Sequence, residues 1–168
     1  MRKSAVLMLL CLGLSVPTAP MVSAQEGREC TPDDVSTRLV LNDTSVPAGD
    51  PIPMKLVAKN TSGESCTMGF PSGRGGTVRV FKNGNPVWEH GYCRVYTQHI
   101  EFETWEAGHR DAYRYRWKQY RLGEDKRGRF DCDGKRDPAK AGTYSAKGIF
   151  FGTEPDAKTE PVEFRITG

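Results

Sequence analysis

The sequence predicts an all-β domain, built as an antiparallel β-sandwich of about nine strands. Short segments with apolar residues at alternate positions recur along the chain, and helical periodicity is absent. Glycine and proline separate these segments every ten or so residues, as turns between strands do. Strands this short bury one face each, so two sheets must pack together to exclude water.

Nine segments carry the alternation: residues 36–41, 53–59, 66–70, 77–81, 86–89, 95–104, 111–119, 143–151 and 161–167. Between them, Asn83-Gly84 and Ala107-Gly108 are hairpin-turn signals. An up-and-down barrel is the alternative architecture. A barrel lined for a ligand would need a consistent second apolar face, which these segments lack, so the sandwich is favoured.

Residues 95–104 and 111–119 are expected to pair as a hairpin around Gly108. In the second strand, aromatic and basic side chains alternate: Tyr113, Tyr115 and Trp117 against Arg114, Arg116 and Lys118. In the first strand, the expected inward residues are Tyr96, Ile100 and Phe102, and the expected outward residues are His99, Glu101 and Glu103. We therefore predict that Glu101 faces Arg116 or Arg114, each such pair contributing roughly 0.2–1 kcal/mol.

The start of the chain has the pattern of a signal peptide. Arg2 and Lys3 precede an apolar run over residues 5–14, which is too short to span a bilayer. Small residues at Val22-Ser23-Ala24 place cleavage after residue 24; an N-terminal membrane anchor is the alternative. The expected organisation is a signal peptide at 1–24, a flexible segment at 25–35 and a β-sandwich domain at 36–168. The product would be secreted or periplasmic, with no membrane span after cleavage.

Charge argues against a dedicated nucleic-acid binder. The chain has 24 basic and 21 acidic side chains, and cleavage removes Arg2 and Lys3, which leaves it close to neutral. A local excess of base lies in residues 110–140. It could form a patch for an acidic partner, but pairing of its strand half with Glu101 and Glu103 is the favoured interpretation.

The cysteines predict two disulfides. Four remain after cleavage, and an even count in an exported chain is typical of disulfides. The chain lacks a Cys-x-x-Cys pair, which argues against a zinc or redox site. If neighbouring strands run antiparallel, Cys30 and Cys66 lie at one pole of the sandwich, and Cys93 and Cys132 at the other. We therefore favour Cys30–Cys66 and Cys93–Cys132, although other pairings remain possible from the sequence alone.

Motifs for catalysis or metal binding are absent from the sequence. It contains neither Gly-x-Ser-x-Gly nor His-Glu-x-x-His, and its histidines, His90, His99 and His109, are isolated. Asp131 and Asp133 resemble a weak calcium pattern, for which a solvated loop is the favoured interpretation. We expect no catalytic residue, no metal and no cofactor. A hydrolase with an unrecognised site is the alternative.

The order of several short motifs resembles a known family. They are Leu56–Gly63, Phe70–Gly73, Val78–Val80, Asn83-Gly84, Val87-Trp88, Tyr96–Gln98, Gly108, Tyr113–Trp117 and Ala141–Tyr144. In this order they are similar to the BsuPI-type intracellular proteinase inhibitor domain, an immunoglobulin-like β-sandwich, over residues 36–166. Export, the four cysteines, the charged insertion at 120–140 and Ala141 in place of a proline depart from the family pattern.

Two exposed loops are candidates for partner contact under this resemblance. In the first, at residues 70–76, the candidates are Phe70, Pro71, Ser72 and Arg74, of which Arg74 could enter a base-specific protease pocket; a plain turn is the alternative. In the insertion, the candidates are Lys126, Arg127 and Arg129. The resemblance implies a binding domain that acts by protein–protein contact, with a protease as a possible partner. The alternative is a structural or adhesive cell-envelope module. The sequence does not give the oligomeric state.

Overall fold

Strands dominate the computed structural model, which describes residues 27–124, 127, 129–134 and 136–168. In this part of the chain, nine strands have five or more residues: β1 (Val35–Leu41), β3 (Ile52–Asn60), β4 (Cys66–Pro71), β5 (Gly76–Lys82), β6 (Asn85–Glu89), β7 (Ile100–Trp105), β8 (Arg110–Trp117), β13 (Gly142–Phe150) and β15 (Val162–Thr167). Each overlaps one predicted segment, and the all-β sandwich prediction is confirmed.

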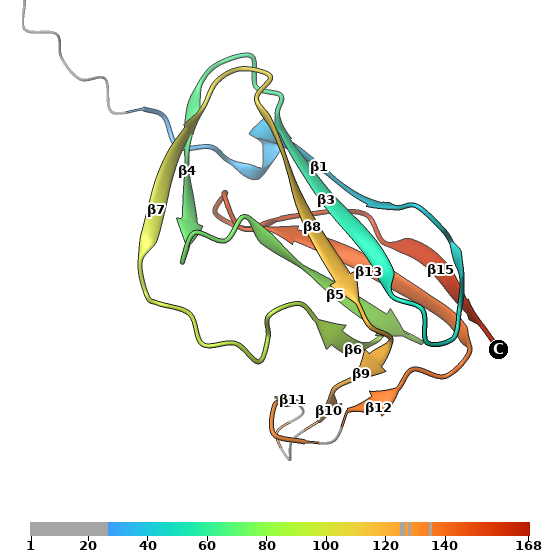
Figure 1. The fold of residues 1–168 in the computed structure, drawn as a ribbon. Coiled ribbons are helices and arrows are strands. Elements are labelled where there is room, and N and C mark those ends of the chain that lie inside the picture. The colour runs from blue at the N-terminus through green and yellow to red at the C-terminus, as the bar shows by residue number, and fades with distance from the viewer. Residues whose placement is uncertain (1–26, 125–126, 128, 135) are drawn as a thin grey trace, which may run out of the picture.

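Shorter elements complete the chain. They are the 3-10 turn η1 (Pro32–Asp34) and the strands β2 (Ser45–Pro47), β9 (Tyr120–Arg121), β10 (Gly123–Glu124), β11 (Phe130–Asp131), β12 (Asp137–Pro138) and β14 (Ala157–Lys158). One layer has the strand order β1-β3-β8, and the other has β2-β15-β13-β5-β6 (Figure 1). Among the strands of the described residues, pairing is antiparallel except between β15 and β2, and an isolated parallel bridge joins Glu29 to Thr67.

The core lies between these layers. Trp117 of β8 packs against Tyr144 and Phe164 of the facing sheet, with ring centroids 5.5 and 6.1 Å apart. Leu56 of β3 is fully buried. The two sheets approach so closely at this point that a Cβ atom added to Gly148 would lie 2.7 Å from Cδ1 of Leu56. Because the facing side chains interdigitate in this way, both sheets bury one face and expose the other.

The predicted parity of β8 is confirmed. Trp117 and Tyr115 are buried, whereas Arg114 and Arg116 are exposed. Alternation alone fixes this arrangement, because successive side chains of a strand point to opposite faces.

The predicted hairpin between residues 95–104 and 111–119 is wrong. Strand β8 pairs with β3, and β7 pairs with β4 in a separate two-stranded ribbon. The link from β3 to β4 and the link from β7 to β8 meet at Gly108, whose N–H donates to the carbonyl of Asn60. The Gly108 turn therefore leads β7 into β8 without pairing them, and β3 supplies the apolar partner face that β8 requires.

The expected orientation of β7 is also wrong. Ile100 and Phe102 are 59% and 69% exposed, while Trp105 is buried. The register places Glu101 opposite Phe70 and Arg116 opposite Pro53, so the predicted contact between Glu101 and Arg116 or Arg114 does not form. Glu101 and Glu103 lie on the same face of the ribbon as the buried Trp105. Both glutamates are nevertheless exposed to water. Residues 95–99, predicted as the start of this strand, form no strand.

The N-terminal segment is fastened from Arg28 onward. Arg28 pairs with Asp34 at 2.7 Å, and the N–H of Cys30 donates to the carbonyl of Thr67 at 2.9 Å. The predicted signal peptide lies outside the described residues. In the described ranges, no helix has the length and apolar character required to cross a membrane.

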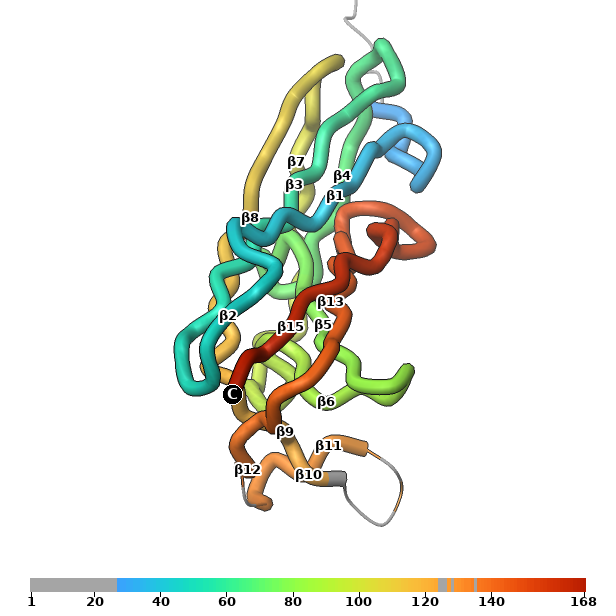
Figure 2. The backbone as a smooth tube through the Cα atoms, turned by 90° about the vertical axis from the view of Figure 1, so that its right-hand side faces the viewer, coloured from blue at the N-terminus to red at the C-terminus, as the bar shows by residue number. Residues whose placement is uncertain are grey.

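Two disulfides close opposite ends of the molecule. Cys30 joins Cys66 with a Cα–Cα distance of 5.1 Å, and Cys93 joins Cys132 at 5.2 Å. This is the pairing favoured from the sequence. The second bond holds the insertion, in which β9 pairs with β12 and β10 with β11. Figures 1 and 2 both show these short strands at the end remote from β4 and β7.

Candidate partner-binding loop

An irregular segment, the 91–99 loop, joins β6 to β7 and runs along the outside of the sandwich (Figure 1, yellow-green). Val95 is an exposed apolar residue of this loop, with a relative exposure of 102%. An aliphatic side chain in this position gains no burial in the free protein, so a partner that covered it would add favourable apolar burial. The loop is fixed on both sides of Val95 by covalent, aromatic and hydrogen-bonding contacts.

The N-terminal side of the loop is held by a disulfide and a turn. Cys93 is bonded to Cys132 in the insertion, and the Tyr92 ring meets the Phe130 ring edge-on with centroids 4.9 Å apart. The N–H of Arg94 donates to the carbonyl of Gly91 at 3.0 Å. These contacts fix the chain up to the residue before Val95.

Aromatic contacts hold Tyr96, the residue that follows Val95. The guanidinium of Arg74 lies over the Tyr96 ring, 3.9 Å from its centroid, and 5.0 Å from the centroid of Phe151. The Tyr96 hydroxyl sits where a Cβ on Gly91 would stand, and Gly91 has a positive φ of 72°. Only glycine fits this position without displacing Tyr96.

Hydrogen bonds from the β4–β5 turn hold the C-terminal side. The Ser72 hydroxyl donates to the carbonyl of Thr97, and its N–H donates to the carbonyl of His99 at 2.7 Å. The His99 ring bridges the Thr97 hydroxyl at 2.9 Å and the Glu101 carboxylate at 2.8 Å. The loop thus reaches β7 with little freedom left to its backbone.

The first predicted contact loop supports the 91–99 loop in this structure. Phe70 is buried in β4 against Phe150, with ring centroids 5.7 Å apart, whereas Pro71 is exposed. Ser72 and Arg74 point to the 91–99 loop, as their contacts with Thr97 and Tyr96 show. A direct partner contact by these four residues stays a prediction.

The second predicted contact loop is described in part. Lys126 lies outside the described residues. Arg127 and Arg129 are exposed between β10 and β11. The Asp131 carboxylate accepts the N–H of Asp133 at 3.1 Å, which closes a turn. In the described residues, no three His, Cys, Asp or Glu side chains gather as a metal site would require.

The three histidines take different positions. The His90 ring packs 4.9 Å from Tyr115, where burial lowers the pKa of His90, and the charges of Arg94 and Arg74 add to this effect. His109 packs 4.6 Å from Trp105 at the opposite end, and His99 holds the 91–99 loop. These contacts give each histidine a structural role.

Sequence reasoning missed Val95 because residues 95–99 were read as the start of a strand, whereas the structure has them in the loop. The exposure of Val95 could not be read from its own residue type, because valine is common in strands.

Comparison with known proteins gives distant likenesses among solved structures. A β-glucosidase from Listeria innocua in complex with isofagomine has 10% identity and a TM-score of 0.45, covering 80% of this chain and 16% of that chain. The CARDB domain of the PF1109 protein from Pyrococcus furiosus has 12% identity and a TM-score of 0.40, covering 80% and 91%. Spo0M, a sporulation control protein from Bacillus subtilis, has 9% identity and a TM-score of 0.44, covering 80% and 50%. This chain therefore spans a small part of the β-glucosidase.

Curated proteins gave no match. The family model of BsuPI, described as "Intracellular proteinase inhibitor", matches residues 39–155 of the 168-residue chain. This range includes the core strands from β3 to β13 and the whole 91–99 loop. Because the match spans well over half of the sequence, the chain belongs to the BsuPI proteinase inhibitor family.

Proposed function

We propose that this chain is an exported protease inhibitor whose 91–99 loop enters the substrate cleft of its target. The fully exposed Val95, fixed on both sides by scaffold contacts, is the observation that carries the proposal. Its side chain would occupy a specificity pocket shaped for a small aliphatic residue. The chain would act by protein–protein contact, without catalysis or a cofactor.

Preorganisation is the physical argument for this role. A flexible loop loses conformational entropy on binding, which weakens the complex, whereas a loop already held in place avoids most of that cost. Exposed loops on a rigid scaffold are the usual carriers of such contacts. The disulfide at Cys93, the stacking of Arg74 on Tyr96 and the hydrogen bonds from Ser72 all reduce the motion of the segment around Val95.

The compartment also fits an exported inhibitor. Two disulfides indicate an oxidising environment, because thiols stay reduced in the cytosol. Together with the signal-peptide pattern of residues 1–24, they support a secreted or periplasmic location, in contrast to the intracellular inhibitor that gives the family its name.

An inhibition assay of the purified protein against serine proteases tests the proposal. The panel should contain enzymes that prefer small aliphatic, basic and aromatic residues. We expect inhibition of the aliphatic-specific enzymes, with Val95→Asp weakening it by about 30-fold or more, as for the removal of a central interface residue. Phe102→Ser is the matched control, because Phe102 is also an exposed apolar side chain, at 69%, but lies outside the loop. It should inhibit like the wild type.

Two results would contradict the proposal. If the wild type inhibits none of the proteases at micromolar concentration, the structural or adhesive envelope module becomes the better assignment. If Arg94→Ala abolishes inhibition of the base-specific enzymes while Val95→Asp does not, the loop is the contact element but Val95 is not the residue that enters the pocket.

A further inference from the structure

The outer surface of the β1-β3-β8 sheet has an unusual charge distribution. Its outward positions carry six basic side chains, which we call the basic face: Arg38, Lys55, Lys59, Arg110, Arg114 and Arg116. Five of the six are exposed and Lys55 is half-buried. Along these three fully described strands, no Asp or Glu occupies an outward position.

Like charges oppose each other directly on this surface. Lys55 stands across from Arg114, and Lys59 across from Arg110. Like charges in such cross-strand positions repel and destabilise a sheet. Glu101 and Glu103, the acids expected to neutralise these bases, lie on β7 instead. In the described part of the chain, no ion pair reaches any of the six side chains.

The opposite outer face of the sandwich differs. There Arg79 pairs with Glu89 at 2.6 Å, and Glu163 stands two residues from Arg165 on β15. That face therefore carries acids as well as bases, as an ordinary soluble surface does, although Lys147 stands across from Arg79. Of the two outer faces, only the basic face lacks acidic side chains on its described strands. Its opposed like charges lower the stability of the fold.

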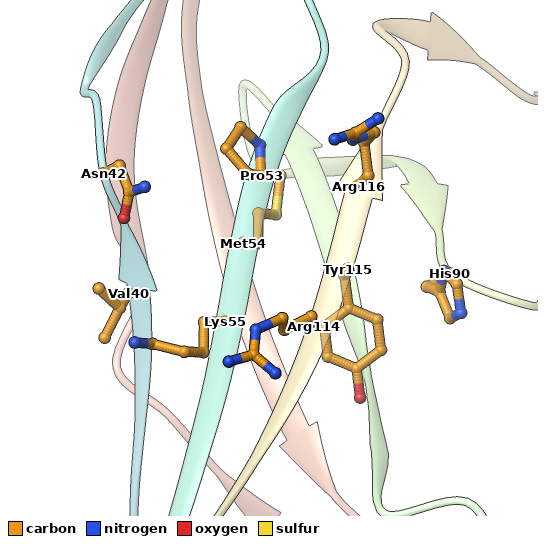
Figure 3. Close-up of a pocket in the computed structure, with 9 residues that line it drawn as sticks. All are labelled: Val40, Asn42, Pro53, Met54, Lys55, His90, Arg114, Tyr115 and Arg116. Atoms are coloured by element: carbon orange, nitrogen blue, oxygen red, sulfur yellow. The ribbon is translucent and has the colours of Figure 1, made fainter.

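A shallow cavity of about 500 Å³ opens on the basic face (Figure 3). Figure 3 shows Lys55 and Arg114 side by side, with Arg116 further along β8 and Asn42 just beyond the end of β1. The ionisable groups that line it are Lys55, Arg114 and Arg116, with His90 and Tyr115 at its edge, and its apolar lining comes from Val40, Pro53 and Met54. A cavity with this lining favours an anion over a cation or a neutral molecule.

We propose that the basic face binds a linear anionic polysaccharide, with its guanidinium groups contacting sulfate or carboxylate substituents. Guanidinium presents paired N–H donors that match both groups. Alternate residues along a strand lie about 6.8 Å apart and neighbouring strands about 4.8 Å apart, which gives a regular grid of cations for a repeating chain. This inference stands independently of the proposed inhibition, because the 91–99 loop does not contribute to the basic face.

The composition of the face argues for a polysaccharide over other polyanions. Protein interfaces bury a core with aromatic and apolar anchors, and the outward positions here hold Val40, Pro53, Val57 and Ala112 but no aromatic residue. Single-stranded nucleic acids are bound by bases stacked on exposed aromatic rings, which the outward positions lack, since Tyr115 at the cavity is buried. Anionic sugars can be held by charge and hydrogen bonds alone.

Binding to immobilised heparin (sulfated), polygalacturonate (carboxylated) and neutral dextran tests the proposal. The matched variants are Arg38→Glu/Arg114→Glu on the basic face and Lys147→Glu/Arg165→Glu on the opposite face, which change the net charge equally. We expect the wild type to bind heparin but not dextran, with affinity falling as salt rises. The first variant should lose at least tenfold in affinity and the second less than twofold. Binding to polygalacturonate as well would extend the ligand to carboxylates.

Cooperative urea denaturation of both variants would show that they fold, and because it does not use protease inhibition, it separates this test from that of the proposed function. An equal loss of heparin affinity in the two variants would overturn the proposal, because it would show attraction by net charge without a site. Tighter binding of duplex DNA or of polyglutamate than of either glycan would overturn it too, in favour of a nucleic acid or an acidic protein. Absence of binding to both glycans at low salt would also contradict it.

Discussion

The side-chain amide of Asn60 donates a hydrogen bond to the carbonyl of Trp105, 2.9 Å away and 45 residues later in the chain. The same NH₂ group reaches the carbonyl of Glu64 at 2.8 Å, and the amide oxygen accepts the N–H of Ser62 at 3.0 Å. Asn60 is fully buried. It therefore fixes the corner at which β3 and β8 pass into β4 and β7.

Asn60→Ala should lower the free energy of unfolding by about 2–3 kcal/mol. The substitution removes the side-chain donor to the buried carbonyl of Trp105 and the acceptor for Ser62, and an unsatisfied buried group costs about 1–3 kcal/mol. Urea denaturation followed by tryptophan fluorescence measures the change, because Trp105 is buried at this corner.

Asn42→Ala provides the comparison, since Asn42 is an exposed asparagine just after β1. It should change stability by less than about 0.5 kcal/mol, as surface substitutions usually do. Equal effects of the two substitutions would show that the Asn60 hydrogen bonds do not hold the corner.

Local alternation predicted the features that one strand settles by itself. The buried Trp117 and exposed Arg116 follow from the two-residue period of β8 and from the side chains involved. The even cysteine count and the alternating direction of the strands likewise led to the pairs Cys30–Cys66 and Cys93–Cys132 found in the structure.

Strand partnership could not be predicted from local patterns. β7 carries Ile100 and Phe102 on one face and Glu101 and Glu103 on the other, so alternation places the apolar face inward. In the two-stranded ribbon, Trp105 determines the orientation, because it is the residue that packs into the core. The glutamates share its face, yet they stay in contact with water at the free edge of the ribbon.

The candidate site was accessible from the sequence only in part. Arg74 was singled out as a contact residue, and the structure places it beside the 91–99 loop, stacked on Tyr96. Val95 was assigned to a strand, because an aliphatic residue near a run of strand formers carries no mark of exposure. Its position depends on Cys132 and Ser72, which are distant in the sequence.

Removing each disulfide should separate stability from inhibition. The two bonds join cysteines 36 and 39 residues apart, so loop-closure entropy predicts a similar loss of about 2–4 kcal/mol for either. Cys93→Ser/Cys132→Ser should also weaken protease inhibition more than tenfold, because it frees the loop that presents Val95. Thermal denaturation and inhibition constants, both determined below the unfolding range, measure the two effects.

Cys30→Ser/Cys66→Ser is the matched variant. Its bond lies at the start of β4, away from the 91–99 loop, so its inhibition constant should stay within about twofold of the wild type at temperatures where it is folded. The assignment of the loop would fail if the two double variants lost inhibition to the same extent.

Arg114→Glu should stabilise the fold while it weakens glycan binding. The substitution replaces a repulsive pair across from Lys55 with an attractive one, a gain of roughly 0.2–1 kcal/mol in the free energy of unfolding. Urea denaturation at low and high salt measures the gain, which should shrink as salt screens the pair.

Arg38→Glu is the control for this effect. Arg38 stands across from Val57, a neutral residue, so the reversed charge gains no directly opposed partner. Its stability should change less than that of Arg114→Glu, although both substitutions remove a cation from the basic face. A larger gain at Arg38 would indicate that net charge, and not the cross-strand pair, limits stability.

His90 should make the fold sensitive to mild acid. Burial lowers the pKa of this histidine below its usual value of 6.5, and Arg94 and Arg74 lower it further. In the unfolded chain His90 takes up a proton near pH 6.5, while the folded protein resists it, so the unfolded state binds more protons below that pH. Stability should therefore be constant with respect to His90 above pH 6.5 and fall as the pH drops below it.

Thermal denaturation of the wild type and of His90→Gln, at several pH values on both sides of 6.5, measures this contribution. The wild type should lose more stability on acidification than the variant, because glutamine has no proton to gain. Arg94→Gln should reduce the difference, since it removes one of the two charges that oppose protonation. If the wild type and His90→Gln followed parallel pH profiles, the packing of this ring against Tyr115 would not restrict its protonation.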